Sequence, residues 1–333
     1  MSLELDPEVL QQLTRVSDTG LLTLFGRALE SRNRGCLDDP QAEALAEAMK
    51  PALARSDRPL HRRLARGRIS RVLGVYMGLR ARHFDRLALD FCVRRGGEGE
   101  VPVVVNLGCG LDSRFFRLRA QLSDQLSDQL SARQPGQAFE LIDVDLPAMI
   151  GLKAKLMAPE PGYSQLAADV SRPDWIGKLP LERPLIFLAE GLLMYLEPED
   201  VRALVLGLRV RSPGCELVAE VVRRRWLEGW RRKVLDRKLQ GNFSIDASVG
   251  FRFGVESGEE LAGWGDGIEV LGEWSLFDEG APGLRGMNWM GRVDGLRRLQ
   301  WVIHWRLGSR TPGKIPQPNN PETSTEVFAR SSQ

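Results

Sequence analysis

One glycine turn and three acidic residues occupy the positions in this sequence where ligand chemistry is expected. The apolar segment "VPVVVNL" runs into Gly108 and Gly110, and three later apolar segments end at Asp145, Asp169 and Glu190. Glycines at such a turn allow a tight bend and let a ligand approach the backbone closely. Carboxylates accept hydrogen bonds from sugar hydroxyls and amines. Together these residues predict a binding site for a nucleotide-like ligand.

The elements that would position these residues are strands that alternate with helices. Apolar segments predict strands near 103–107, 139–145, 165–168, 184–190, 215–222, 268–277 and 301–308. We therefore expect an α/β fold with a doubly wound, mostly parallel seven-stranded sheet. Because ligands bind outside the carboxyl ends of such strands, the glycine turn and the acidic residues should converge on one edge of the sheet.

The sequence patterns divide the chain into three regions. Residues 1–95 carry apolar positions at helical spacing and predict a helical region before the first strand. Residues 96–308 hold the alternating strands and helices, interrupted at 223–266 by an insertion with helical patterns of its own. Residues 309–333 are rich in Pro, Ser, Thr and Asn, which predicts a disordered tail.

The bulk composition excludes several classes of protein. Hydrophobic residues make up 43% of the chain and the net charge is +2, as in an ordinary globular protein. No apolar stretch approaches the roughly 20 residues that span a bilayer, so we expect a cytoplasmic protein without a membrane partner. Four scattered cysteines without a CxxC pair favour reduced thiols over disulfides or a metal site. The near-neutral charge argues against nucleic acid, although basic runs beside Trp226 and Trp230 leave base stacking as an alternative.

The spacing around the glycine turn favours S-adenosylmethionine over a dinucleotide. A dinucleotide site needs a third glycine, where this chain has Ser113, and an acid about 20 residues further on. Asp145 instead lies 37 residues past Gly108. S-adenosylmethionine needs one acidic residue for its ribose and another near its adenine, with glycine backbone beside its methionine part. It also needs a cation for its carboxylate, and a nicotinamide cofactor remains the alternative at this point.

Several motifs resemble those of a known family. "NLGCGLDSRFFRL", "DVDLP", "AADV" and "AEGLLMYLEPEDV" are similar to motifs of the leucine carboxyl methyltransferase family, whose members are S-adenosylmethionine-dependent O-methyltransferases. "LLTLFGRALESR", "LRARHFD" and "FRFGVESGEEL" look more like its bacterial branch, which includes polyketide-type O-methyltransferases. The resemblance covers roughly residues 20 to 308. The chain departs from the family pattern at Cys109, where alanine is usual, and at Ser113, where threonine is usual.

This resemblance implies a class I methyltransferase core with a Rossmann-like sheet. Residues 1–95 would form a helical lid over S-adenosylmethionine, and the insertion at 223–266 would cap the side where the methyl acceptor binds. The lid would contribute Arg80, which binds the methionine carboxylate, and Arg27, whose role stays open. The other cofactor contacts that the resemblance implies are Gly108 and Gly110 along the methionine part, Asp145 at the ribose, Asp169 and Val170 at the adenine, and Glu190 near the methionine amine.

For the methyl acceptor, we expect a carboxylate of a small molecule. A carboxylate is already ionised at neutral pH, whereas a hydroxyl needs a base, and none of His61, His83 and His304 stands at a strand end. We therefore assign no catalytic base. Seven of the eight tryptophans fall between residues 226 and 305, which favours a bulky, aromatic acceptor over a tiny metabolite. We expect a small-molecule acceptor rather than a protein C-terminus. Methylation of a hydroxyl or phenol, and a protein that binds the cofactor without transferring a methyl group, are the alternatives.

Overall fold

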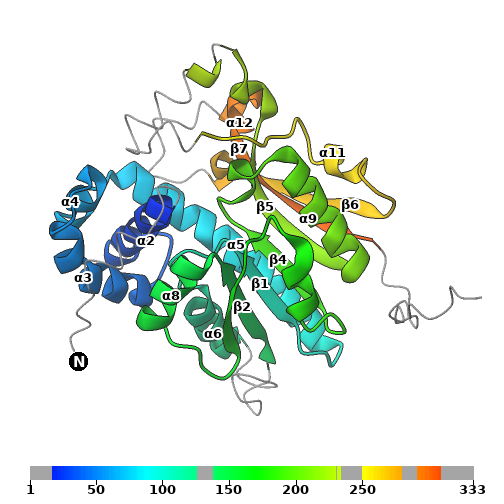
Figure 1. Cartoon of the computed structure of the whole chain (residues 1–333), viewed down its shortest axis with the longest axis horizontal. Coiled ribbons are helices and arrows are strands. Elements are labelled where there is room, and N and C mark those ends of the chain that lie inside the picture. The colour runs from blue at the N-terminus through cyan, green and yellow to red at the C-terminus, as the bar shows by residue number, and fades with distance from the viewer. Residues whose placement is uncertain (1–16, 126–137, 230, 234–249, 280–290, 309–333) are drawn as a thin grey trace, which may run out of the picture.

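The computed structural model describes residues 17–125, 138–229, 231–233, 250–279 and 291–308 (Figure 1). The expected disordered tail at 309–333 lies outside the described residues, as do the first 16 residues of the expected lid. No helix within the described ranges is long and apolar enough to cross a membrane.

A seven-stranded sheet forms the centre of the molecule. Its strands lie in the order β3-β2-β1-β4-β5-β7-β6. The strands β1 to β5 pair in parallel, and β7 lies antiparallel between β5 and β6. This order confirms the predicted doubly wound α/β fold. The bounds are β1 Val103–Leu107, β2 Glu140–Asp145, β3 Tyr163–Ala167, β4 Leu185–Ala189, β5 Cys215–Val222, β6 Ile268–Trp274 and β7 Gln300–Leu307.

The central strands are buried on both faces because helices cover the sheet from both sides. Every residue of β1, β4 and β5 is buried, which explains their mostly apolar sequences. The polar exceptions, Asn106, Glu216 and Glu220, are buried as well. The register sets Asn106 of β1 beside Asp143 of β2 and Leu188 of β4. The carboxyl ends of these strands therefore lie level with one another, and the loops that follow them open at the same edge.

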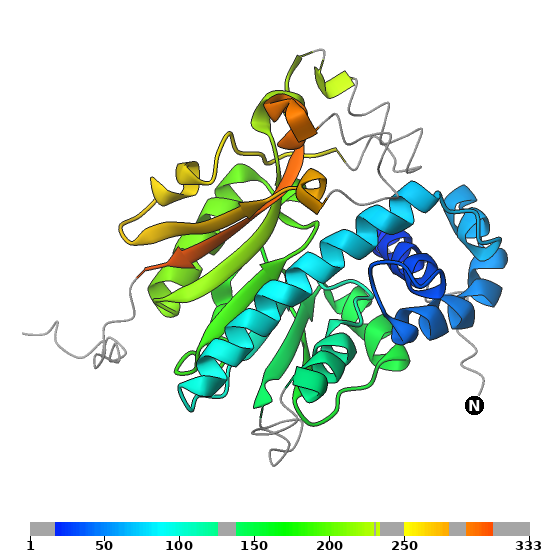
Figure 2. The ribbon, with the colours of Figure 1, turned by 180° about the vertical axis from the view of Figure 1, so that it is seen from behind.

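The N-terminal helices gather at this edge of the sheet. The bounds of the helices before the first strand are α2 Ser17–Arg32, α3 Pro40–Ala54, α4 Pro59–Ala65 and α5 Arg71–Gly97. Helix α3 starts at Asp39, whose side chain accepts a hydrogen bond from Ala42 N at 3.0 Å. Figure 2 shows that α5 leaves this group of helices and runs along the face of the sheet. The expected boundary between lid and core at residue 95 thus falls inside a continuous helix.

The remaining helices follow the strands. They are α6 Arg114–Gln125, α8 Pro147–Leu156 and α9 Pro198–Arg211, with short helical turns at η1 Pro173–Lys178, η2 Leu193–Tyr195, η6 Leu276–Glu279 and α12 Asp294–Arg297. The expected helical insertion at 223–266 is helical only in short pieces where it is described. It holds a 3-10 turn, η3 Arg224–Leu227, and a four-residue helix, α11 Glu259–Ala262. Residues 234–249 of the insertion lie outside the described part.

Candidate functional site

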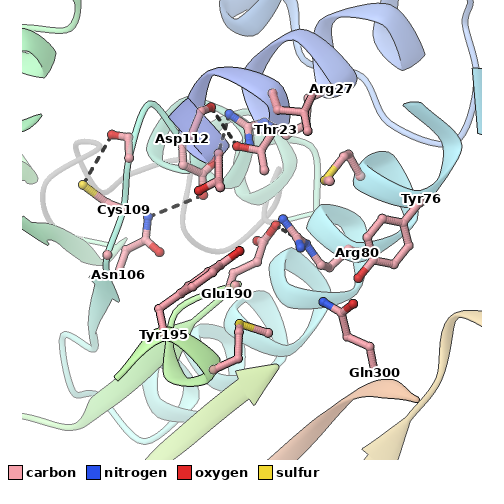
Figure 3. A pocket seen from close by; sticks show the side chains of 18 of the residues that line it. Thr23, Arg27, Tyr76, Arg80, Asn106, Cys109, Asp112, Glu190, Tyr195 and Gln300 are labelled. Carbon is pink, nitrogen blue, oxygen red and sulfur yellow. Dashed lines mark hydrogen bonds and ion pairs between the residues drawn. The ribbon is translucent and has the colours of Figure 1, made fainter. Parts of the chain in front are cut away.

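A pocket opens at the carboxyl ends of β1 and β4, under helices α2 and α5 (Figure 3). It encloses about 850 Å³ of free space, counting its open mouth. The glycine turn, Asn106 and Asp112 lie at one end in Figure 3, and Tyr76 and Gln300 lie at the other. The residues that line it are Thr19, Gly20, Leu22, Thr23, Arg27, Tyr76, Met77, Arg80, Asn106, Gly108, Cys109, Gly110, Asp112, Glu190, Gly191, Met194, Tyr195, Phe251 and Gln300.

The glycine turn after β1 keeps its backbone open toward the pocket. Gly108 and Gly110 have φ angles of 59° and 50°, which side-chain-bearing residues rarely adopt. A Cβ atom on Gly108 would lie 2.8 Å from Leu192 Cδ1, so a side chain there would collide with the loop after β4. A Cβ atom on Gly110 would lie 3.7 Å from the Cα of Gly20 in α2. The glycine turn and α2 thus approach each other closely at two glycines that both line the pocket.

Asp145 holds this turn from the end of β2. One carboxylate oxygen accepts a hydrogen bond from Gly110 N at 2.8 Å, and the other accepts from Leu146 N at 2.7 Å. Burial raises the pKa of Asp145, although both backbone donors favour its ionised form. Asp145 supports the pocket from behind the glycine turn and is absent from the residues that line it.

Asp169 and Val170 follow β3, one strand further from the pocket. Asp169 is exposed, and its Oδ1 accepts hydrogen bonds from the backbone and side chain of Ser171 at 3.0 and 2.8 Å. Val170 is buried in the core. Of the seven expected cofactor residues, Arg80, Gly108, Gly110 and Glu190 line the pocket, whereas Asp145, Asp169 and Val170 lie at neighbouring strand ends.

Arg80 lies between two buried carboxylates at the middle of the pocket. Its Nε donates to Glu190 Oε1 at 2.8 Å, and its Nη1 donates to Glu220 Oε2 at 2.9 Å. Neither of these two hydrogen bonds uses Nη2. Burial alone would raise the pKa of Glu190, but Arg80 and Arg114 outweigh burial and lower it. Arg80 therefore stays charged and retains donors for a further anion.

A network of buried charges supports this part of the site from below. Arg114 of α6 donates to Glu190, and its Nε donates to Asp85 of α5 at 2.7 Å. Arg117, one turn further on, donates to the second oxygen of Asp85 at 2.6 Å and to Asp39 at 2.7 Å. The network joins three elements that are distant in the sequence. It also anchors the helices before β1 to the sheet.

Sequence reasoning missed most of these residues. The motif "DSRFFRL" was quoted for its resemblance, yet its two arginines gave no sign of being buried. The available signal was their spacing, because two arginines three residues apart, with two phenylalanines between them, share one face of a helix. Also missed were Tyr76, Asn106, Asp112, Glu220 and Gln300, which lie in or beside the pocket.

The histidines and the described tryptophans are absent from the pocket lining. None of the three histidines, all of which are described, lines the pocket. His83 instead stacks on Trp274 with ring centroids 4.2 Å apart, and His61 and His304 contact Asp18 and Glu216. The tryptophan-rich region contributes no described tryptophan to the pocket lining, which takes its aromatic residues from Tyr76, Tyr195 and Phe251. Trp226 packs behind the lining, against the cluster that contains Met194 and Phe251, and Trp230 and Trp289 lie outside the described side chains.

Comparison with known proteins identifies the family. The family model described as leucine carboxyl methyltransferase matches residues 20–208, which is more than half of the chain. The chain belongs to the leucine carboxyl methyltransferase family. As a member, it is a methyltransferase that uses S-adenosylmethionine as methyl donor.

Two relatives and one solved structure illustrate what the chain is similar to. The chain is 28% identical over 268 residues to the tetracenomycin polyketide synthesis O-methyltransferase TcmP of Streptomyces glaucescens, covering 80% of this chain and 85% of that protein. It is 30% identical over 208 residues to the S-adenosyl-L-methionine-dependent methyltransferase dpfgK of Gibberella zeae, covering 58% of this chain and 60% of that relative. A solved structure of a DUF574 family protein from Streptomyces avermitilis aligns with a TM-score of 0.48 at 14% identity, covering 78% of this chain and 96% of that one.

The residues of the pocket fit this cofactor. The facing glycines Gly20 and Gly110 leave space that a Cβ atom would fill. Beside this space, the guanidinium of Arg80 and the carboxylate of Glu190 lie 2.8 Å apart. A cation and an anion so placed complement the carboxylate and the ammonium of an amino acid. The methionine part of S-adenosylmethionine carries both groups.

Proposed function

We propose that this enzyme transfers a methyl group to a carboxylate oxygen of a small aromatic or polyketide-like molecule. The observation that carries the proposal is the make-up of the pocket lining, which combines the charged Arg80 and Glu190 with the apolar Met77, Met194 and Phe251 and contains no histidine. The printed name of the Streptomyces relative, a polyketide synthesis O-methyltransferase, supports transfer to oxygen and a polyketide-like acceptor. We propose a cytoplasmic enzyme that acts on neither nucleic acid nor protein.

We infer the following roles for the cofactor site. Arg80 binds the methionine carboxylate through its Nη2 and its remaining Nη1 donor, while Glu190 accepts from the ammonium. The backbone of Gly108 and Gly110 lies along the methionine part. The remaining roles go to Asp145, which binds the ribose hydroxyls, and to Asp169 and Val170, which contact the adenine.

These roles leave the chain's own residues with the tasks of binding and alignment. When bound, S-adenosylmethionine supplies an electrophilic methyl group on a positively charged sulfur. Met194, Tyr195 and Phe251 form the apolar part of the lining, where they exclude water from the acceptor. A carboxylate needs no deprotonation at neutral pH, so no residue has to remove a proton. Alignment of the acceptor oxygen with the methyl group accelerates the transfer, since well-oriented reactants have an effective molarity on the order of 10⁵ M or more.

One observation favours a second candidate, methylation of a hydroxyl. Tyr76 lines the pocket and its hydroxyl donates to Glu220 Oε1 at 2.6 Å. Burial raises the pKa of Glu220. A hydroxyl acceptor beside Tyr76 would therefore have a route by which its proton passes through the phenol to Glu220.

The pH dependence of kcat separates the two candidates. With a carboxylic acid as acceptor, we expect kcat to change little between about pH 6 and 9, because no group has to lose a proton. The measurement is a single-turnover or steady-state pH profile with an aromatic carboxylic acid. A strong rise through neutral pH that is lost in Glu220→Gln would favour the hydroxyl reaction.

A further inference from the structure

Glu220 binds three side chains from three directions at the acceptor end of the pocket. Its carboxylate lies near the end of β5 and is 2% exposed. Tyr76 of α5 donates to Oε1 at 2.6 Å, Gln300 of β7 donates to Oε1 at 2.8 Å, and Arg80 donates to Oε2 at 2.9 Å. Glu220 itself is absent from the pocket lining, whereas all three of its partners line the pocket. Glu220 therefore acts on the pocket only through these neighbours.

The direction of these hydrogen bonds determines what the neighbours offer a ligand. An ionised carboxylate only accepts hydrogen bonds, so Tyr76 has to give it its single proton and Gln300 has to turn its Nε2 toward it. What remains at Tyr76 is an oxygen with lone pairs. What remains at Gln300 is its Oε1 and one N–H. Toward the pocket, this wall is rich in hydrogen-bond acceptors.

Burial raises the pKa of Glu220, whereas the Arg80 charge and the donors Tyr76 and Gln300 favour its ionised form. Burial and the Glu220 charge both raise the pKa of Tyr76, so its hydroxyl keeps its proton. The Arg80 guanidinium lies 5.5 Å from the centre of the Tyr76 ring and pairs with Glu220, which favours the ionised carboxylate. The neighbouring lining of Met77, Met194 and Phe251 is apolar. Figure 3 shows Tyr76 and Gln300 on the same side of Arg80, away from the glycine turn.

We propose that Glu220 sets the acceptor specificity by making Tyr76 and Gln300 hydrogen-bond acceptors. The methyl acceptor would then carry a neutral hydroxyl in addition to the oxygen that is methylated, as an aromatic hydroxy acid does. This inference rests on the proposed function for the identity of the methylated group. An acceptor without such a donor displaces water from the Tyr76 and Gln300 oxygens without replacing its hydrogen bonds, which lowers the affinity of that acceptor.

The test compares ligands that differ only in this donor. Hydroxynaphthoic acids and their fluoro counterparts, in which fluorine replaces the hydroxyl at matched positions, are titrated by calorimetry into the protein saturated with S-adenosylhomocysteine. We expect the best hydroxy acid to bind about ten-fold more tightly than its fluoro counterpart. Tyr76→Phe and Gln300→Met should each reduce this ratio toward one. In Glu220→Gln the new amide can itself donate, so the ratio should also fall.

The controls separate recognition from folding and from chemistry. Tyr195→Phe removes another hydroxyl from the same pocket, one that Glu220 does not contact, and should retain the preference. S-adenosylhomocysteine affinity unchanged in Tyr76→Phe shows that the cofactor site is intact. The proposal is wrong if no hydroxy acid binds more tightly than its fluoro counterpart, and this includes the case in which neither binds. It is also wrong if Tyr76→Phe leaves the affinity ratio unchanged. An ether product from a hydroxy acid would contradict carboxylate methylation. It would leave the present proposal untouched, because the binding ratio is measured without turnover.

Discussion

Arg80 donates to two buried carboxylates through Nε and Nη1, and its proposed role toward a third carboxylate, that of the cofactor, can be tested. In Arg80→Lys, one ammonium cannot reproduce the planar fork that reaches Glu190, Glu220 and a ligand carboxylate together. Loss of a charge-assisted bond of about 1.5–3 kcal/mol corresponds to about 10- to 150-fold weaker binding. We expect this loss for S-adenosylmethionine and S-adenosylhomocysteine in parallel by calorimetry, since both carry the same carboxylate. Arg82→Lys, on the same helix but exposed, is the matched control.

If Arg80→Lys changed only the KM of the methyl acceptor, Arg80 would belong to the acceptor site and not to the cofactor site.

Asp145 provides a second test at the level of single residues. It holds Gly110 N and, in the proposed site, the ribose hydroxyls. Asp145→Ala should weaken S-adenosylmethionine binding by about 10- to 150-fold, because hydrogen bonds to a charged group contribute about 1.5–3 kcal/mol. Asp174→Ala, at an exposed acid in η1, is the control and should bind normally. Undiminished affinity of the Asp145 variant in calorimetry would exclude this carboxylate from the cofactor site.

The lowered pKa of His83 leads to a prediction of how the free energy of unfolding depends on pH. Burial, together with the nearby Arg86, lowers its pKa from 6.5 to about 3. Between these pH values the unfolded chain binds a proton that the folded chain does not, so the free energy of unfolding falls as the pH drops below 6.5. The slope from one such group is at most about 1.4 kcal/mol per pH unit. Denaturant unfolding of His83→Phe, which keeps a ring on Trp274, should show a smaller slope in this range. Equal slopes in the two proteins would contradict the assignment.

At the scale of elements, the strands could be predicted because their apolar runs are continuous. The run before Gly108 and the acidic residues after β2 and β4 gave both the strands and the edge where they converge. Buried charges could not be predicted in this way, because Arg114 and Arg117 are polar residues whose partners lie on other elements. The sequence patterns placed the end of the lid at residue 95, inside helix α5, which ends at Gly97 and runs along the sheet. Local patterns thus predict elements, and long-range pairing decides how those elements join.

The junction between α5 and α6 leads to a stability prediction. Asp85 is 1% exposed and accepts from Arg114 and Arg117. Asp85→Asn leaves two buried guanidinium groups without their full counter-charge, and removal of one partner from such a pair costs about 3–5 kcal/mol. We expect a loss of this size in the free energy of unfolding by chemical denaturation. Asp90→Asn, exposed on the same helix, should change it by less than about 0.5 kcal/mol. Equal effects of the two substitutions would show that the buried network does not join these helices.

At the scale of the whole molecule, one pocket divides into two chemical environments. In the proposed function, the glycine turn, Arg80 and Glu190 bind the charged methionine part of the cofactor, and the apolar side chains of Met77, Met194 and Phe251 in the same lining contact the acceptor. Transfer of a methyl cation equivalent from a sulfonium to a carboxylate neutralises both charges. A pocket that excludes water therefore favours the reaction, since it destabilises the separated charges of the reactants more than the neutral products.

The identity of the methylated atom is the central claim, and alkaline hydrolysis of the product tests it most directly. The enzyme is incubated with S-adenosylmethionine labelled in its methyl group and a series of aromatic hydroxy acids, and the labelled product is isolated and treated with mild base. If the carboxylate is methylated, the label is released as methanol and the parent acid is recovered. If the label instead remains on the aromatic product as a base-stable ether, the enzyme methylates a hydroxyl and the claim is contradicted.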